Sequence, residues 1–369
     1  MKPNHLLTIF CALFFLNINA QTFTPVKRVV IEELTGTWCG WCPRGAVYAD
    51  SLANMYPNTT EIIAVHNNSS GIEPMVVGIY DTGATSLPFF GGGFPAIEVD
   101  RLLADDPTDI FTHYYNHIND FGLADITVTV VYDTSTRIAT VNATAHFAQA
   151  VNGGGYNLAL VITEDSVHNN SSPYDQDNYY SFQAMNMPLT GAGHNWQAEP
   201  NPVPAADMYY NHVARTIDGT YLGTNGSLPS TIAAGAIENY SFTYTVPLTS
   251  YPEQMKAIIL LININTSAIM NANHAGLTSN LTGVSEAAQK RSAHIYPNPL
   301  AKGATLQIDK MLTDASLAVY NSVGELVQQA ENISGNTIPL NKDLPGGLYF
   351  ICVKQDGNTV MGGKLIISN

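Results

Sequence analysis

The chain has 369 residues, a formal net charge of −15 and a pI near 4.9. This composition argues against a nucleic-acid-binding protein, which needs clustered Lys and Arg to neutralise phosphates. Only 12% of the residues are charged, about half of the usual share, so Asn, Thr, Ser and Gly supply much of the polar surface. The length predicts two or three domains of roughly 100 to 200 residues each.

The N-terminal segment has the pattern of a secretory signal peptide. Lys2 precedes an apolar run over residues 6–16, and Ala20 offers a small residue for cleavage. We therefore expect residues 1–20 to be removed and the rest of the chain to be exported into an oxidising compartment, where disulfides persist. No later apolar stretch reaches about 18 residues, so no transmembrane segment is predicted.

Residues 25–123 alternate predicted strands with predicted helices. The β-branched run over residues 26–34 is typical of a strand that is buried on both faces. Residues 43–56 carry apolar side chains at near-helical spacing, which predicts a helix. The further elements expected here are strands at residues 61–65 and 96–99 and a helix from Asp106 to Phe121.

Cys39 and Cys42 lie between the first predicted strand and the first predicted helix. Two thiols separated by two residues can close a small, easily reduced disulfide. Pro43 is tolerated in a first helical turn, so Cys39 would lie at the positive end of the helix dipole, which stabilises a thiolate. A thiol redox site is the leading interpretation. Two alternatives stay open, half of a zinc site and an inert structural disulfide, although no second Cys pair supplies further zinc ligands.

The central segment, residues 124–283, changes to alternating apolar and polar residues and predicts a β-sandwich. The strands expected here lie at residues 126–132, 139–147, 156–163, 240–246 and 257–264. Between Glu164 and Met208 lies a polar stretch that is longer than the loops of compact domains usually are. We interpret it either as a binding loop or as a mobile excursion.

A polar linker over residues 284–294 precedes a C-terminal segment of short strands and turns, residues 295–369. Its motifs are Tyr296-Pro297-Asn298-Pro299, Gly346-Gly347-Leu348-Tyr349 and Lys364-Leu365-Ile366-Ile367. Their order resembles the type A C-terminal sorting domain of the type IX secretion system. The resemblance implies a small β-sandwich that interacts with the secretion and sorting machinery and is then removed. The remaining protein would be released or attached to surface lipopolysaccharide; the alternative is a plain immunoglobulin-like stalk.

The stretch from Val30 to Gly45, with Phe94-Pro95-Ala96 and Asp100-Arg101, resembles the outer-membrane-protein-28-related family. That family joins a thioredoxin-like domain to a β-rich domain. The resemblance therefore implies a thioredoxin-like domain over residues 25–123 and a β-sandwich over residues 124–283. It implies this architecture rather than an activity.

The thioredoxin-like resemblance also implies roles for four residues. Cys39 would be the exposed nucleophile and Cys42 the resolving cysteine. Pro95 would be a cis proline that helps to hold a client strand. Glu33, six residues before Cys39, would be a buried acid that passes a proton to Cys42. The residues alone leave alternatives, because Glu33 could lie on the surface of an edge strand and Pro95 could merely start a strand.

Two classes of function follow from these observations. The first is thiol–disulfide exchange on exported client proteins, as an oxidase or isomerase rather than a reductase, because an exported reductase needs an electron donor. The second is a surface binding or adhesion module in which the disulfide is structural. Neither class needs a cofactor, and no metal site is predicted. The expected location is the outer-membrane cell surface or the extracellular space.

Overall fold

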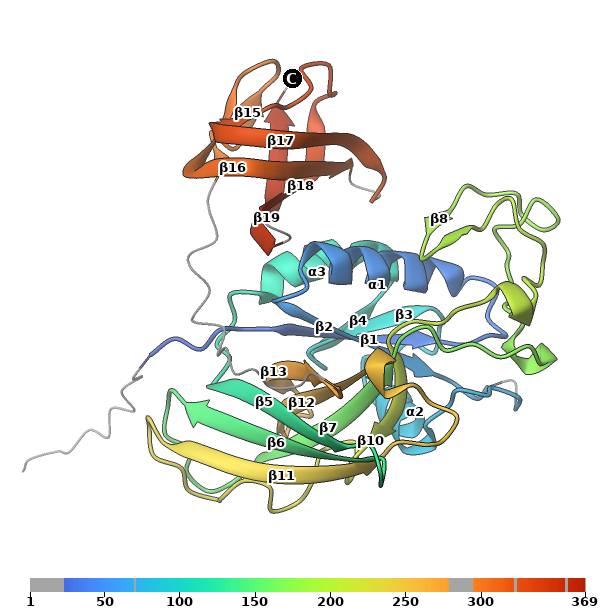
Figure 1. Ribbon diagram of the computed structural model, residues 1–369, viewed down its shortest axis with the longest axis vertical. Coiled ribbons are helices and arrows are strands. Elements are labelled where there is room, and N and C mark those ends of the chain that lie inside the picture. Colours follow the sequence, from blue (N-terminus) through green and yellow to red (C-terminus); the bar gives the residue numbers. More distant parts are fainter. Residues whose placement is uncertain (1–22, 70, 279–294, 322–323, 356–357, 369) are drawn as a thin grey trace, which may run out of the picture.

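The computed structural model describes residues 23–69, 71–278, 295–321, 324–355 and 358–368. The predicted signal peptide and the predicted linker lie outside these residues. Strands make up most of the secondary structure that is described (Figure 1). No helix in these ranges is both long and apolar enough to cross a membrane.

The largest sheet has eight strands and runs through both of the first two predicted segments. In order across the sheet, the strands are β13 (Ile269–Gly276), β12 (Met255–Asn263), β7 (Tyr156–Glu164), β10 (Val213–Ile217), β2 (Thr60–His66), β1 (Val29–Thr35), β3 (Ala96–Val99) and β4 (Leu103–Asp105). The pairs β1–β2 and β2–β10 are parallel, and the other neighbours are antiparallel. All residues of β1 and β2 are buried, as their apolar composition predicts.

The central segment adds a second layer to this sheet. β5 (Ala124–Asp133), β6 (Ile138–Phe147) and β11 (Ile237–Thr245) form a three-stranded sheet in the order β11-β6-β5. Its apolar face packs on β7 and β12 around a core that includes Phe147, Leu160 and Ile259. The segment is thus two-layered, as the alternating pattern predicts. Its larger layer is not a separate sheet, however, because β10 pairs with β2 across the boundary predicted between residues 123 and 124.

Helices cover both faces of the first part of the large sheet (Figure 1). α1 (Pro43–Met55) and α3 (Ile110–His117) bury Leu52 and Ile110 against Ile31 of β1. α2 (Gly78–Thr85) buries Tyr80 on the opposite face. The helix predicted from Asp106 is divided into a short 3-10 turn, η1 (Pro107–Asp109), and α3.

The long stretch between β7 and β10 is packed against the body of the protein. We call residues 165–212 the cap segment. It contains η2 (Ser172–Tyr174), β8 (Thr190–Gly191), β9 (His194–Asn195) and η3 (Ala205–Asp207). Figure 1 shows β8 beside α1, and Trp196 of the cap segment is buried in the same cluster as Val47 of α1. A further 3-10 turn, η4 (Pro252–Gln254), precedes β12.

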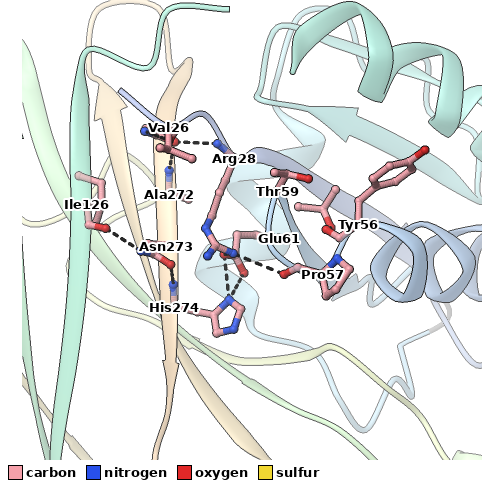
Figure 2. A network of polar contacts seen from close by, with 12 residues as sticks. Val26, Arg28, Tyr56, Pro57, Thr59, Glu61, Ile126, Ala272, Asn273 and His274 are labelled. Carbon is pink, nitrogen blue, oxygen red and sulfur yellow. Dashed lines mark hydrogen bonds and ion pairs between the residues drawn. The ribbon is translucent and has the colours of Figure 1, made fainter. Parts of the chain in front are cut away.

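Polar contacts fasten β13 to the start of the chain (Figure 2). Arg28 Nη1 donates to Glu61 Oε1 of β2 at 3.1 Å, and His274 Nδ1 of β13 lies 2.8 Å from Glu61 Oε2. Asn273 Nδ2 of β13 donates to the carbonyl oxygen of Ile126 at 2.6 Å. These contacts join β13, β2 and β5, so the two predicted segments are held together at this side as well as through the sheet.

The C-terminal domain, residues 295–368, has its own sheet and core. Its strands are β14 (Ile295–Tyr296), β15 (Leu300–Ala301), β16 (Leu306–Asn321), β17 (Leu326–Ile338), β18 (Gly347–Gln355) and β19 (Asn358–Ser368). The domain contacts the helical face through Phe350, whose ring centroid lies 4.9 Å from that of Phe111 and 5.5 Å from that of Tyr115. Cys352 is buried in the same contact, as its apolar strand predicts.

Candidate redox site

Cys39 and Cys42 form a disulfide at the N-terminus of α1. Two consecutive turns shape the loop: Cys39 N–H donates to the carbonyl oxygen of Gly36 at 3.1 Å, and Cys42 N–H donates to that of Cys39 at 3.0 Å. Pro43 then begins the helix, as predicted. Cys39 is 5% exposed and Cys42 is 2% exposed. The thioredoxin-like resemblance implies an exposed Cys39, but here the residue is covered.

The cap segment is what covers Cys39. Asp177 N–H donates to the carbonyl oxygen of Thr37, and Tyr179 N–H donates to that of Gly40, each at 2.8 Å. Gln176 Nε2 donates to the carbonyl oxygen of Cys39 at 3.1 Å. A Cβ atom at Gly40 would lie only 2.3 Å from Cδ1 of Tyr179, so the cap segment packs directly on the loop between the cysteines. This close approach requires glycine at that position.

Glu33 lies behind the disulfide, on the face of β1 that points to α1. It is buried, and its Oε1 atom has no hydrogen-bond partner among the described residues. A Cβ atom at Gly45 would lie 2.1 Å from this oxygen and 3.1 Å from Cβ of Pro95, so these three residues meet. Burial raises the pKa of Glu33 to about 8; a hydrogen bond with Thr35 opposes the shift. Because β1 lies inside the sheet, the edge-strand alternative for Glu33 is wrong.

Pro95 precedes β3 and forms a cis peptide bond with Phe94. The cis bond agrees with the thioredoxin-like resemblance, and Pro95 also directly precedes a strand. The ring centroid of Phe94 lies 5.4 Å from that of Trp38, which directly precedes Cys39. The structure thus brings Cys39, Cys42, Pro95 and Glu33 into one site.

Glu73 positions the CxxC loop, residues 36–42, from the other side, and no sequence motif indicates this role. Thr37 N–H donates to Glu73 Oε2 at 2.8 Å, and His66 Nδ1 lies 3.0 Å from Glu73 Oε1. Burial raises the pKa of Glu73. The hydrogen bond and the charge of His66 lower this pKa by more than burial raises it, so the net shift is downward. The strand predicted at residues 61–65 extends by one residue, and His66 is the buried last residue of β2. The parallel pairing of β1 and β2 could have indicated where His66 lies. Parallel strands bring their carboxyl ends together, and β1 ends just before the CxxC loop.

A small cavity of about 40 Å³ lies beneath Cys42. Titratable side chains from several elements line it: Glu33, Asp50, His66, His194 and His212. Within the described ranges, no three His, Cys, Asp or Glu side chains come together in a group that could hold a metal ion. The acids and bases among the lining residues can hold or transfer protons next to Cys42.

Comparison with known proteins places the C-terminal domain. Residues 294–368 match the family described as the secretion system C-terminal sorting domain, and none of the curated proteins is similar in sequence to the chain. Two solved structures that resemble it are HBP35 of Porphyromonas gingivalis and the protein AGR_C_4864 from Agrobacterium tumefaciens.

HBP35 is 17% identical, with a TM-score of 0.48, and the likeness covers 94% of this chain and 99% of that one. The Agrobacterium tumefaciens protein is 10% identical, with a TM-score of 0.40, over 71% of this chain and 100% of that one. Both likenesses are weak, and the family match is the finding that bears on location. The chain carries a type IX secretion C-terminal sorting domain, which indicates export to the cell surface or the extracellular space.

Proposed function

We propose that the protein performs thiol–disulfide exchange on other exported polypeptides. The observation that carries this proposal is the buried Glu33 carboxyl, which faces the same cavity as Cys42 and has an oxygen without a hydrogen-bond partner. Burying an unpartnered polar group costs free energy. A structural disulfide has no use for such a group, whereas a leaving thiolate needs a proton.

The same features support our assignment of residues 25–123 to a thioredoxin-like unit of the outer-membrane-protein-28-related family. β1, the CxxC loop, α1, the parallel strand β2 and Pro95 before β3 follow one another in the expected order. On this assignment residues 124–283 are the β-rich unit, although the two units share a sheet.

In the oxidase direction, a client thiolate attacks Cys39 Sγ and the bond between Cys39 and Cys42 breaks. Cys42 leaves as a thiolate and takes the proton of the Glu33 carboxyl. A second client thiolate then attacks the client sulfur of the mixed disulfide, and Cys39 leaves as a thiolate stabilised at the N-terminus of α1. The client loses two electrons, and the cysteine pair gains them.

Isomerisation uses the same groups without net electron transfer. The oxidase step leaves the cysteine pair reduced by the client's two electrons. The reduced Cys39 then attacks a client disulfide, the client rearranges, and Cys39 is released again. An exported protein needs no electron donor for this cycle. We therefore favour oxidase or isomerase activity over reductase activity.

Pro95 and the cap segment define where a client can approach. Two backbone hydrogen bonds already join the cap segment to the CxxC loop, through Asp177 and Tyr179. A client segment must therefore lie on the side of Pro95 or displace the cap segment. In the proposed complex, the residue next to Pro95 offers its backbone to an extended client strand.

Trapping of mixed disulfides tests this proposal. In the full chain, Cys42→Ala keeps the attacking thiol but removes the resolving one, so we expect it to accumulate covalent adducts with an unfolded, disulfide-containing polypeptide. Cys39→Ala is the matched control, because it keeps Cys42 and Cys352 but removes the nucleophile. Equal adduct formation by both variants, measured on non-reducing gels, would contradict the assignment of Cys39.

One observation favours the second candidate function, a surface binding module with a structural disulfide. Cys39 is almost completely covered by the cap segment. A midpoint potential of the Cys39–Cys42 pair below about −300 mV, with no exchange against glutathione, would identify the bond as structural. A higher potential with measurable exchange supports the redox function.

A further inference from the structure

We infer that Asp50 and His212 form an acid–base pair that controls when Glu33 holds its proton and that connects Glu33 to solvent. This inference rests on the proposed thiol–disulfide exchange. It gives a role to two residues that lie far apart in the sequence and that no local motif connects. The cysteines and Glu33 perform the exchange, and Asp50 and His212 act on it as positioning residues.

His212 is held rigidly between two carboxylates. Its Nε2 atom lies 2.9 Å from Asp50 Oδ1, and its Nδ1 atom lies 3.5 Å from Asp165 Oδ1. The backbone N–H of His212 also donates to Asp165 Oδ1 at 2.8 Å. The φ angle of His212 is 57°, a left-handed conformation that is uncommon for a residue other than glycine. The structure thus holds an unfavourable backbone in place where the ring meets both carboxylates.

Asp50 and Glu33 face each other through the cavity beneath Cys42. Asp50 comes from α1 and Glu33 from β1, and both line the cavity together with Cys42 and His212. The unpartnered Oε1 of Glu33 is fully buried, so the cavity is the place where it can find a proton partner. Burial is the main cause of the raised pKa of Glu33, and the charge of Asp50 adds to it.

The pair also leads out of the protein. Asp165, on the far side of His212, forms an ion pair with Lys256 at 3.0 Å, and both side chains are about one-third exposed. Burial raises the pKa of Asp165, but the charges of His212 and Lys256 lower it by a larger amount. The net pKa is therefore lowered, and Asp165 stays ionised next to the imidazole. Asp50, His212 and Asp165 therefore form a continuous polar path from the cavity to the surface.

The other titratable groups at the cavity are engaged elsewhere. His66 is bonded to Glu73, and His194 lies 2.9 Å from Glu199 Oε1. Tyr210 donates its hydroxyl hydrogen to a backbone carbonyl oxygen, and burial raises its pKa far above the neutral range. Tyr209, which completes the set, stacks on His168 at 4.5 Å. Asp50 and His212 differ from the bonded pairs of His66 and His194 because both of their side chains line the cavity.

The pair has a defined task in the exchange reaction. When the bond between Cys39 and Cys42 breaks, the Glu33 carboxyl gives its proton to the Cys42 thiolate and becomes a carboxylate. Solvent replaces that proton by way of His212 and Asp50. In the reverse reaction, Cys42 returns its proton to Glu33, and the same path carries it away.

The pH profile of disulfide reduction tests this inference in the full chain. We would follow reduction by dithiothreitol through the fluorescence of Trp38 and Trp41, which flank Cys39, and divide each rate by the thiolate fraction of the reagent. In the wild type, the corrected rate should fall above pH about 8, where Glu33 loses its proton. Glu33→Gln should abolish this break.

Replacing the two positioning residues should move the break in opposite directions. Asp50→Asn removes a negative charge that favours the protonated Glu33, so the break should move down by about one pH unit. His212→Gln removes the imidazole that bonds to Asp50, so the Asp50 carboxylate should act more strongly on Glu33 and the break should move up by a similar amount. General damage to the fold would not produce opposite shifts, and Asp50→Ser repeats the charge removal if Asp50→Asn fails to fold.

A second Asp–His pair provides the matched control. His113 Nε2 lies 2.9 Å from Asp105 Oδ2, outside the cavity, so Asp105→Asn and His113→Gln should leave the break in place. A wild-type profile without a break, or shifts that are absent or in the same direction for Asp50 and His212, would overturn the inference. Loss of adduct trapping by Cys42→Ala with intact shifts would instead overturn the proposed function alone.

Discussion

Glu32 and Glu33 are neighbours on β1. Both carboxyl groups are buried, but on opposite faces of the sheet and with different partners. Glu32 points toward α2, where Arg101 Nη2 donates to it at 2.6 Å and the Tyr80 hydroxyl donates at 2.6 Å. Its charge is therefore paired and hydrogen-bonded, as buried charges in a stable core usually are. Glu33 points toward α1 and keeps an oxygen without a partner. The contrast within two residues sets Glu33 apart as a functional group.

Glu33→Gln should change how the free energy of unfolding depends on pH. The folded pKa of Glu33, about 8, lies above the ordinary value of 4.5, so folding favours the protonated form. The resulting stability is complete below pH 4.5 and is lost as the pH rises to about 8; the loss is up to about 5 kcal/mol. The variant lacks this loss, so it should gain stability relative to the wild type across this range. Urea unfolding at pH about 5, 6.5 and 8 measures the difference, and parallel pH dependences would contradict a buried neutral Glu33.

The sequence predicted the residues of the site that are recognisable by spacing. Cys39 and Cys42 are defined by their separation, and Pro95 and Glu33 by their positions relative to them. Asp50, Glu73 and His212 could not be predicted in this way. Glu73 and His212 reach the site because β1, β2 and β10 lie side by side, and Asp50 reaches it because α1 packs on that sheet. A single sequence does not show such long-range packing.

At the scale of elements, the cap segment limits the access of other molecules to the disulfide. The backbone N–H of Tyr179 donates to the carbonyl oxygen of Gly40, and the Tyr179 ring packs against Gly40. Tyr179 also contacts Trp41, with ring centroids 5.4 Å apart. The long polar stretch thus folds onto the candidate site.

Tyr179→Ala should make the disulfide more accessible to glutathione. The lost ring contact is worth about 1 kcal/mol, which raises the population of the open cap about fivefold and the reduction rate with it. Phe182→Ala is the matched control, because Phe182 lies on the same segment, is 57% exposed and should leave the rate unchanged. Equal rates for wild type and Tyr179→Ala, in stopped-flow reduction, would show that the cap does not limit access.

Elements with a strong pattern were predicted well, and weak elements were missed. β1, β2, β3 and α1 lie within a few residues of their predicted positions. α2 was missed because it contains glycines at both Gly78 and Gly83, which disfavour a helix. β10 was missed because it is short and carries Arg215 and Thr216 in place of an apolar run. Its backbone pairing with β2, not its side chains, fixes it in the sheet.

At the scale of the whole molecule, the first two predicted segments form one continuous structure. The parallel pairing of β10 with β2 joins them in the sheet, and Glu61 accepts hydrogen bonds from Arg28 and His274 at the other side. The change from helices to alternating strands near residue 124 was a sound compositional signal. It marks a change of layer in the fold and not the end of a sheet.

Phe350→Ala should loosen the contact between the C-terminal domain and α3. Phe350 makes two aromatic contacts there, with Phe111 and Tyr115, each worth about 0.5 to 1.5 kcal/mol. We expect amide hydrogen exchange in α3 to become about tenfold faster or more. Tyr296→Ala, at an exposed position of the same domain, is the control. Unchanged exchange in α3 would show that this contact does not protect the helix.

Because the cap segment covers Cys39, the accessibility of the disulfide changes during folding. Cys39 and Cys42 are three residues apart, so their bond can close locally, whereas Gln176, which covers Cys39, lies 137 residues further along the chain. Contacts at such a distance form late in folding, because a long loop must close first. A chain that is still folding therefore presents the pair uncovered. We therefore expect the Cys39–Cys42 pair to react fastest with other thiols before folding is complete, and more slowly afterwards.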